Sequence, residues 1–219
     1  MSKKGCLLFD IDNTLVDRDG AFQRYLQQFI GSNAAAFLDQ DLAGVMEKIL
    51  ALDCHGKKDR ALFCKELLQQ FPGLPYSEAS LWQDCQRLPE FVLKDMALIG
   101  VLERLSAIFH LLIISNGSAA MQRQKLHHAG LTEFFDTIFI SGEVGCAKPD
   151  QRIFLHALQS CPHPAVVMIG DDYTNDMEPA LALALKTIFI NPRKESVRIK
   201  PDREIAHIHS LEEALDCLI

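Results

Sequence analysis

The stretch GCLLFDIDNTLV, residues 5–16, decides the fold that this chain of 219 residues is expected to adopt. Residues 6–9 form a short run of apolar side chains, and two carboxylates, Asp10 and Asp12, follow at once. A run without polar alternation is typical of a strand in a parallel sheet that helices cover on both faces. Carboxylates directly after such a strand are costly anywhere except at the surface or at a metal site.

Further apolar runs, with helical patterns between them, repeat this arrangement along the chain. The runs are residues 111–114, 137–140, 166–169 and 187–190, with a weaker candidate at 204–208. The expected helices between them are residues 118–129, 150–159 and 175–185. Strands that alternate with helices predict an α/β fold with a parallel sheet at its centre.

The segment from residue 17 to residue 91 differs, because it has helical periodicity and no convincing strand. Apolar side chains in this segment recur at the spacing of one helix face. The expected helices are residues 22–30, 42–52, 61–71 and 77–86. We therefore predict an all-α domain at 17–91 that is inserted into an α/β core domain made of residues 1–16 and 92–219.

Composition and charge exclude several classes of protein. Hydrophobic residues make up 48% of the chain, which excludes wholesale disorder. The formal net charge is −7 without a dense run of Lys and Arg, so no nucleic-acid partner is expected. No run reaches the ~18–20 apolar residues of a membrane span, and the first apolar run is too short for a signal peptide. We expect no membrane partner, a cytoplasmic location, a monomer or homodimer, and reduced thiols for the seven cysteines.

Carboxylates recur where the strand at 166–169 ends, in the sequence GDDYTND, residues 170–176. The carboxyl ends of the strands are where open parallel sheets bind ligands. If the first and fourth strands are neighbours, Asp10 and Asp12 converge with Asp171 and Asp176. Such a cluster repels itself unless a cation neutralises it, and ligands that are all oxygen favour Mg²⁺ over Zn²⁺.

The other two strands end in groups that suit an anion. Ser115 and Asn116 stand just before an expected helix N-terminus, and Lys148 follows the third strand. Each group alone has a structural explanation: Asp12 and Thr14 could cap a turn, and Lys148 could be solvated. Because four such groups end four successive strands, we expect one shared site. Its inventory suits phosphoryl transfer, which depends on positioning and charge neutralisation.

At these positions the sequence resembles the haloacid dehalogenase-like (HAD) hydrolase superfamily, most of whose members are phosphatases. Its four motifs occur in order: D-x-D-x-T at residues 10–14, Ser115, Lys148 followed by proline, and G-D-x-x-x-x-D at 170–176. The resemblance extends from about residue 5 to residue 191. It implies a Rossmann-like three-layer parallel-sheet core and identifies the helical insert with the α-helical cap, which closes over the site in this family.

The resemblance also implies catalytic and metal-binding roles. Asp10 would attack the phosphoryl group and form an aspartyl-phosphate. Asp12 would protonate the leaving oxygen and then deprotonate the attacking water. Asp10, the backbone carbonyl of Asp12, and Asp171 would hold Mg²⁺. No role is assigned to Asp172.

Further residues are implied around the phosphoryl group and the metal. Ser115, Asn116 and Lys148 would bind the phosphoryl oxygens. Asp176 would orient Lys148 or contact a metal ligand, and Thr14 would also contact the groups that bind the metal.

The sequence thus predicts a Mg²⁺-dependent phosphatase for a small phosphorylated metabolite, with a nucleotide or a sugar phosphate favoured and phosphoglycolate also open. One alternative is a β-phosphoglucomutase-like phosphotransferase, and nothing in the first motif excludes it. Another is a non-catalytic HAD-fold binding protein, against which the complete motifs argue. A dehalogenase is not expected, because members with that activity lack an acid at the position of Asp12.

Overall fold

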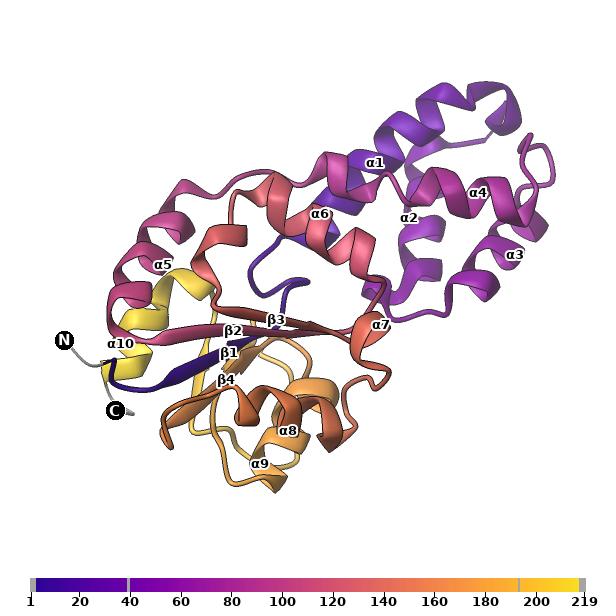
Figure 1. Ribbon diagram of the computed structural model, residues 1–219. Helices are drawn as coiled ribbons and strands as arrows, with labels where there is room; N and C mark the ends of the chain where they lie inside the picture. Colours follow the sequence, from indigo (N-terminus) through magenta and orange to yellow (C-terminus); the bar gives the residue numbers. More distant parts are fainter. Residues whose placement is uncertain (1–2, 39, 193, 217–219) are drawn as a thin grey trace. The chain divides into compact units, whose positions relative to one another are not determined.

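The computed structural model describes residues 3–38, 40–192 and 194–216 (Figure 1). The described chain forms two compact units. One contains the residues up to Val16 together with those from Leu93 onward, and the other is Asp17–Val92. Within the described residues, no helix has the length and apolar character that crossing a bilayer requires.

A six-stranded parallel sheet forms the centre of the first unit, in the order β3-β2-β1-β4-β5-β6. The strands are β1 (Cys6–Phe9), β2 (His110–Ser115), β3 (Thr137–Ile140), β4 (Val166–Gly170), β5 (Lys186–Ile190) and β6 (Arg203–Ile205). The predicted α/β class and parallel sheet are confirmed. Because Phe9 pairs with both Ile113 and Ile169, the ends of β2 and β4 flank the end of β1.

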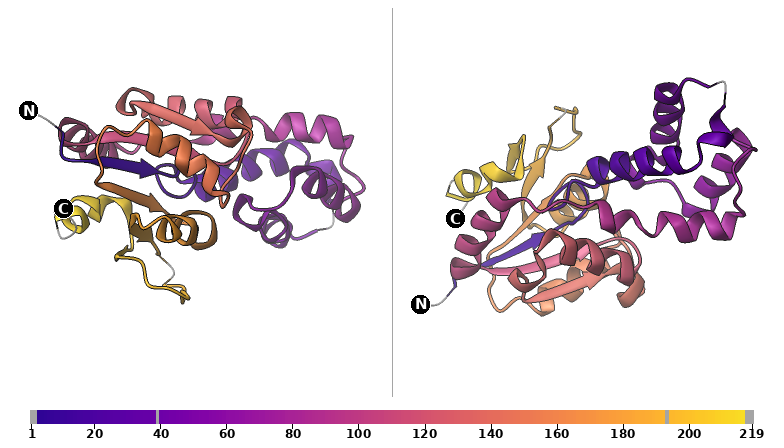
Figure 2. Two further views of the ribbon diagram at one scale, coloured as in Figure 1. Left: turned by 60° about the horizontal axis from the view of Figure 1, so that its bottom comes forward. Right: turned by 90° about the horizontal axis from the view of Figure 1, so that it is seen from above.

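Helices cover both faces of the sheet (Figure 1). One face is covered by α5 (Met96–Ile108), α6 (Ala119–Ala129) and α10 (Leu211–Asp216). The other is covered by α8 (Gln151–Gln159) and α9 (Glu178–Ala182), and the short α7 (Ser141–Val144) follows β3. Figure 2 shows from a second direction that α8 lies over the sheet. The arrangement is the three-layer core that alternating strands and helices predict.

Local capping explains where these helices begin and end. Ser118 and Asp150 cap α6 and α8, because their side chains accept backbone N–H groups of the first turn. Gly130 ends α6 in the left-handed region, at φ 73°. The predicted helices at 118–129 and 150–159 thus match the structure to within one residue at each end.

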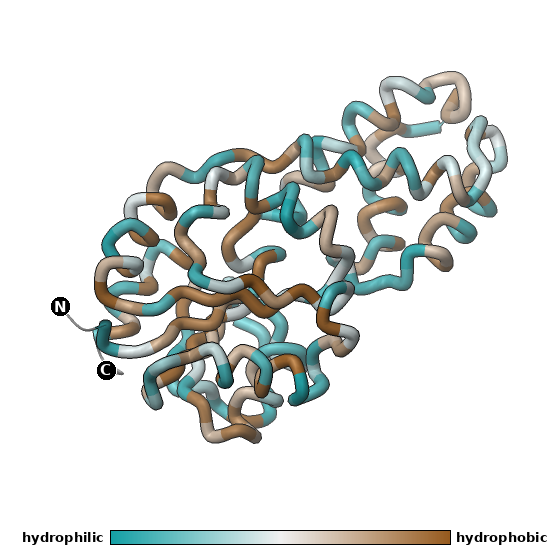
Figure 3. Tube along the Cα trace, viewed as in Figure 1, coloured by the Kyte–Doolittle hydropathy of each residue, from teal (hydrophilic) through white to brown (hydrophobic). Residues whose placement is uncertain are grey.

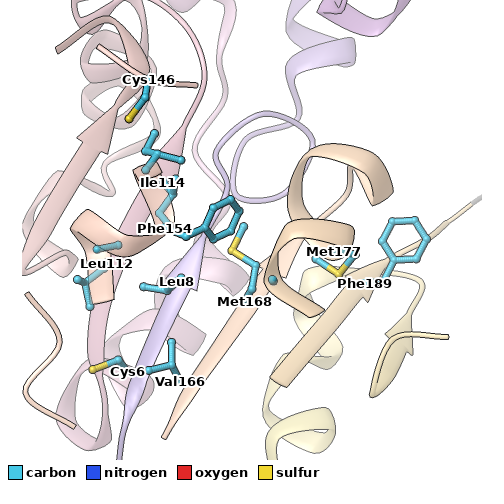
Figure 4. Close-up of a cluster of buried hydrophobic side chains, with 13 residues drawn as sticks. Cys6, Leu8, Leu112, Ile114, Cys146, Phe154, Val166, Met168, Met177 and Phe189 are labelled. Carbon is cyan, nitrogen blue, oxygen red and sulfur yellow. The ribbon is translucent and has the colours of Figure 1, made fainter. Parts of the chain in front are cut away.

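The apolar strands build the core on both sides of the sheet, and Figure 3 shows them as continuously hydrophobic stretches. Figure 4 shows one cluster, in which Phe154 of α8 lies against Leu8 of β1 and Met168 of β4. Cys146 belongs to the same cluster and lies near Ile114. Its thiol is therefore a packing group.

The helix predicted at 175–185 differs from the observed structure. A π-helix at Tyr173–Met177 precedes α9, which ends at Ala182. Asp172 starts the π-helix early, since its carboxylate accepts the N–H groups of Thr174 and Asn175. Pro179, which has no N–H to donate, lies in the first turn of α9. The weaker strand candidate at 204–208 is likewise shorter, at Arg203–Ile205.

The expectation that all cysteines are reduced is wrong for one pair. Cys6, at the start of β1, forms a disulfide with Cys161, beyond the end of α8, and their Cα atoms are 6.2 Å apart. The two cysteines are 155 residues apart in the sequence, so no short spacing motif reveals them. The fold brings them together because β1 and α8 pack against each other.

The second unit is made of helices. They are α1 (Arg18–Ser32), α2 (Leu42–Asp53), α3 (Arg60–Gln70) and α4 (Glu78–Cys85), with short 3-10 turns at Ala34–Phe37, Cys54–Gly56 and Leu88–Phe91. Figure 2 shows these helices packed against one another. Tyr25 of α1 makes ring contacts with Phe22, Phe29 and Phe91, so aromatic side chains form much of this core.

Candidate active site

The carboxyl ends of β1, β2 and β4 bring the predicted site residues to one edge of the sheet. Asp10 follows β1, and its N–H donates to the carbonyl of Ile169 at 3.0 Å, which ties it to β4. Asp171 follows β4, and Ser115 is the last residue of β2. The register of β1, β2 and β4 therefore places Asp10, Ser115 and Asp171 at the same edge of the sheet, as the sequence predicts.

Three carboxylates meet at this edge, from Asp10, Asp171 and Asp176. Each offers an oxygen that lies within 4.8 Å of the other two. The Lys148 ammonium donates to Asp10 Oδ1 and to Asp176 Oδ1, at 2.6 Å each. When all three carboxylates are ionised, one ammonium leaves an excess of two negative charges in this cluster, and a divalent cation would balance it.

Burial perturbs the titration of this cluster. It raises the pKa of Asp171 to about 8, with the charges of Asp10 and Asp176 adding to the effect. It also raises the pKa of Asp176 to about 7, although the ammonium of Lys148 acts in the opposite direction. For Lys148, burial alone would lower the pKa, but the two neighbouring carboxylates outweigh burial and raise it. Strongly perturbed, mutually dependent acids of this kind are typical of functional sites.

The donor set fits a hard cation. The three clustered groups offer only carboxylate oxygens, the ligand type that Mg²⁺ prefers. Thr14 lies beside them, and its hydroxyl donates to Asp171 Oδ1 at 3.5 Å. Of the predicted metal ligands, Asp10 and Asp171 lie together, while the carbonyl of Asp12 remains a prediction.

The Asp12 carboxylate makes its contacts with α6. Lys125 donates to both of its oxygens, at 2.6 and 2.8 Å, and the amide of Gln122 donates to Oδ2 at 3.1 Å. Sequence reasoning missed Gln122 and Lys125. Their spacing could have indicated that they are buried, because both lie on the same helix face as the apolar Leu126 and Ala129.

The predicted phosphate-binding residues have different surroundings. Ser115 is buried, and its hydroxyl oxygen accepts a hydrogen bond from the Gln122 amide at 2.7 Å. Asn116 uses both ends of its side-chain amide on the backbone of Lys148, donating to the carbonyl and accepting from the N–H at 2.8 Å each. In this structure Asn116 therefore supports Lys148, and its contact with a phosphoryl group stays a prediction.

The loop after β4 is built around Asp176, which is fully buried. Its Oδ2 accepts the N–H of Asp172 at 3.1 Å, while Oδ1 accepts from Lys148. Asp172 itself caps the π-helix, which gives this residue the role that the sequence left open. Gly170 is needed for close approach, since a Cβ there would collide with the Asp176 carboxylate.

Comparison with known proteins places this geometry in a family. Residues 5–183 match the haloacid dehalogenase-like hydrolases. The chain therefore belongs to that family, and the resemblance seen in its motifs is confirmed.

Several relatives and solved structures match beyond the motifs. The chain is 36% identical over 108 residues to pyrimidine 5'-nucleotidase YjjG of Escherichia coli (strain K12), which is 47% of this chain and about half (48%) of that protein. It is 28% identical over 210 residues to N-acylneuraminate-9-phosphatase of Mus musculus, covering 87% and 84% of the two chains. The crystal structure of the HAD-hydrolase YfnB from Bacillus subtilis, bound to magnesium, is 26% identical, with a TM-score of 0.77 over 98% of this chain and all of the other.

The family match and these phosphatase relatives make the chain a phosphoric monoester hydrolase in class, as the motifs predict. The structural similarity to YfnB confirms the Rossmann-like core.

Proposed function

We propose that the chain is a Mg²⁺-dependent phosphatase that hydrolyses a small phosphorylated metabolite through an aspartyl-phosphate on Asp10. The observation that carries the proposal is the cluster of Asp10, Asp171 and Asp176, in which the Lys148 ammonium donates to Asp10 and Asp176. A nucleophile, an all-oxygen cation site and a buried cation at one strand edge are what phosphoryl transfer requires.

The chain's own groups account for each step. Asp10 attacks phosphorus, the bond from phosphorus to the leaving oxygen breaks, and Asp12 gives that oxygen a proton. Water then attacks phosphorus and gives a proton to Asp12, the bond between phosphorus and the Asp10 oxygen breaks, and inorganic phosphate leaves. Ser115 and Lys148 bind the phosphoryl oxygens and offset their charge throughout.

The metal site is proposed from the same residues. Asp10, Asp171 and the backbone carbonyl of Asp12 would hold Mg²⁺, while Thr14 and Asp176 orient the groups around it. When bound, the cation supplies charge neutralisation and helps to align the phosphoryl group with the nucleophile.

We favour a nucleotide or a sugar phosphate as the substrate. One relative is named as a pyrimidine 5'-nucleotidase and another as a phosphatase of an acylated sugar acid. The helical unit is proposed to be the cap domain of the family. A cytoplasmic location, a monomeric or homodimeric state and the lack of a nucleic-acid or membrane partner also remain proposals.

The proposal is tested by phosphate release from a panel of nucleoside monophosphates and sugar phosphates at about 1 mM, with Mg²⁺ and with a chelator. We expect hydrolysis that needs Mg²⁺ and that falls on the order of 10⁴-fold in the Asp10→Asn variant, which removes the nucleophile. Asp150→Asn, at the cap of α8, is the matched control and should keep its activity.

An inert wild type would favour the non-catalytic alternative. Slow hydrolysis together with isomerisation of a hexose phosphate would favour the phosphotransferase. Full activity in Asp10→Asn would show that another group attacks phosphorus.

A further inference from the structure

Helix α6 buries two polar side chains on the face that it turns toward the sheet. Gln122 is 2% exposed and Lys125 is 4% exposed, and the apolar Leu126 and Ala129 share that face. Burying an ammonium and an amide in such a place is costly unless each finds a partner. Neither residue belongs to the four motifs that the sequence analysis found.

Their partners include two residues with proposed roles in the reaction. Lys125 donates to both oxygens of Asp12, at 2.6 and 2.8 Å, so the carboxylate is held from two points. Gln122 donates to Asp12 Oδ2 at 3.1 Å and to Ser115 Oγ at 2.7 Å. One turn of helix thus connects the end of β1 with the end of β2.

These contacts restrict both partners. A carboxylate that is bound at both oxygens cannot rotate freely about its terminal torsion. The Ser115 hydroxyl accepts from Gln122, so its own hydrogen is left to donate to another acceptor. A phosphoryl oxygen is the acceptor that the proposed reaction brings to this edge of the sheet.

We infer that Lys125 and Gln122 are positioning residues, which fix the Asp12 carboxylate and the Ser115 hydroxyl as one unit for proton transfer and phosphoryl binding. The inference rests on the proposed function, because it takes Asp12 as the acid and base of that reaction. It adds two residues that act through Asp12 and Ser115.

A purely structural role makes a different prediction. If the two residues served only to anchor α6, their loss would lower stability and would slow all substrates by the same factor. If the two residues act through Asp12, the loss of activity should instead be larger for a substrate whose leaving group needs a proton. Phenolate from phenyl phosphate needs one, whereas p-nitrophenolate leaves readily without it.

The test compares kcat/KM for phenyl phosphate and p-nitrophenyl phosphate in wild type and Lys125→Met, since kcat/KM reports the first transfer step. We expect a loss of about 10–100-fold with phenyl phosphate and less than about 3-fold with p-nitrophenyl phosphate. Gln122→Leu should slow both substrates, because it also releases Ser115, and should slow phenyl phosphate more than p-nitrophenyl phosphate, because it weakens the hold on Asp12. Gln124→Leu, on the exposed face of α6, is the matched control and should change neither value.

A double variant shows whether Lys125 acts through Asp12. Asp12→Asn combined with Lys125→Met should lose no more activity than Asp12→Asn alone. Equal losses with both substrates in Lys125→Met, or losses that multiply in the double variant, would overturn the inference while leaving the proposed function intact. A wild type that is inert toward both substrates with Mg²⁺ would overturn both. Thermal melting of each variant separates loss of folding from loss of positioning.

Discussion

A single methyl group at position 170 should disable the proposed site. The Cβ of an alanine there would collide with the carboxylate of Asp176, which accepts a hydrogen bond from the Lys148 ammonium, as Asp10 does. We expect Gly170→Ala to lower kcat/KM by about 100-fold and the free energy of unfolding by about 1–3 kcal/mol, because a packed core cannot absorb the added volume. Phosphate release and urea unfolding measure the two effects.

Gly100→Ala is the matched control for that substitution. Gly100 lies in α5, and a Cβ there would meet only the end of the Arg104 side chain, at an ordinary 3.6 Å. This variant should keep its activity and gain about 0.5–1 kcal/mol of stability from better helix propensity. Wild-type activity in Gly170→Ala would show that Asp176 and Lys148 can be displaced without consequence.

Individual residues also show where sequence reasoning about the site stops. Asp10 and Asp171 could be predicted, because the ends of neighbouring parallel strands must meet. Lys148 could be predicted from the family motif of a lysine followed by proline. Lys125 could not be paired with Asp12 from the sequence, since 113 positions separate them and no motif joins them. The two hydrogen bonds between the Asn116 side-chain amide and the Lys148 backbone could not be predicted either, because they depend on the conformation of the loops.

Helices α1, α2 and α3 are joined by a buried ion pair that should dominate the stability of the helical unit. Asp53, at the end of α2, accepts from Arg18 of α1 at 2.8 Å and from Arg60 of α3 at 2.9 Å. Burial alone would raise the pKa of Asp53, but the hydrogen bonds and charges of Arg18 and Arg60 outweigh it and lower the pKa. The native state therefore binds fewer protons at this carboxyl than the unfolded chain does.

The sign of that shift sets the prediction for Asp53→Asn. The stability from the pair is fully present above the ordinary pKa of aspartate, about 3.9, and is lost as the pH falls through the lowered pKa of the folded state. At pH 7 the variant should lose about 3–5 kcal/mol, because it removes the buried carboxylate charge that the Arg18 and Arg60 guanidinium groups share. Below about pH 4 the difference between variant and wild type should shrink.

Urea unfolding of the full chain between pH 3 and pH 7, monitored by circular dichroism, measures the difference in the free energy of unfolding between Asp53→Asn and wild type. Glu66→Gln is the control, since its ion pair with Lys58 is partly exposed and should contribute at most about 1 kcal/mol. A loss in Asp53→Asn that does not change with pH would show that the carboxyl's charge is irrelevant and that its shape alone matters.

The first and third strands could be placed from the sequence more accurately than the helix predicted at 175–185. Residues 6–9 and 137–140 are strands with the predicted bounds, because a short apolar run between polar ends permits little else. The π-helix at Tyr173–Met177 could not be predicted from the sequence. It depends on the capping contacts of Asp172 and on the hydrogen bond from Lys148 to Asp176. Local propensity does not encode those contacts.

For the whole molecule, the acidic cluster links folding to pH and to metal. In the folded chain the pKa of Asp171 is about 8 and that of Asp176 is about 7, both raised first by burial, against about 3.9 when unfolded. The native state without metal therefore holds more protons than the unfolded chain across this window. Stability must fall as the pH rises from about 4 to about 8, and Mg²⁺ must compete with the same protons.

We accordingly expect Mg²⁺ to raise the melting temperature more at pH 8 than at pH 6, by about 2–4 °C at a concentration several times its Kd. Differential scanning fluorimetry with millimolar MgCl₂, against KCl of equal ionic strength, measures the gain. Asp171→Asn should abolish it, whereas Glu213→Gln, an exposed acid on α10, should leave it unchanged. A gain that is equal at both pH values, or that persists in Asp171→Asn, would mean that the cation binds elsewhere, because only a site built on these perturbed carboxyls must release protons to accept it.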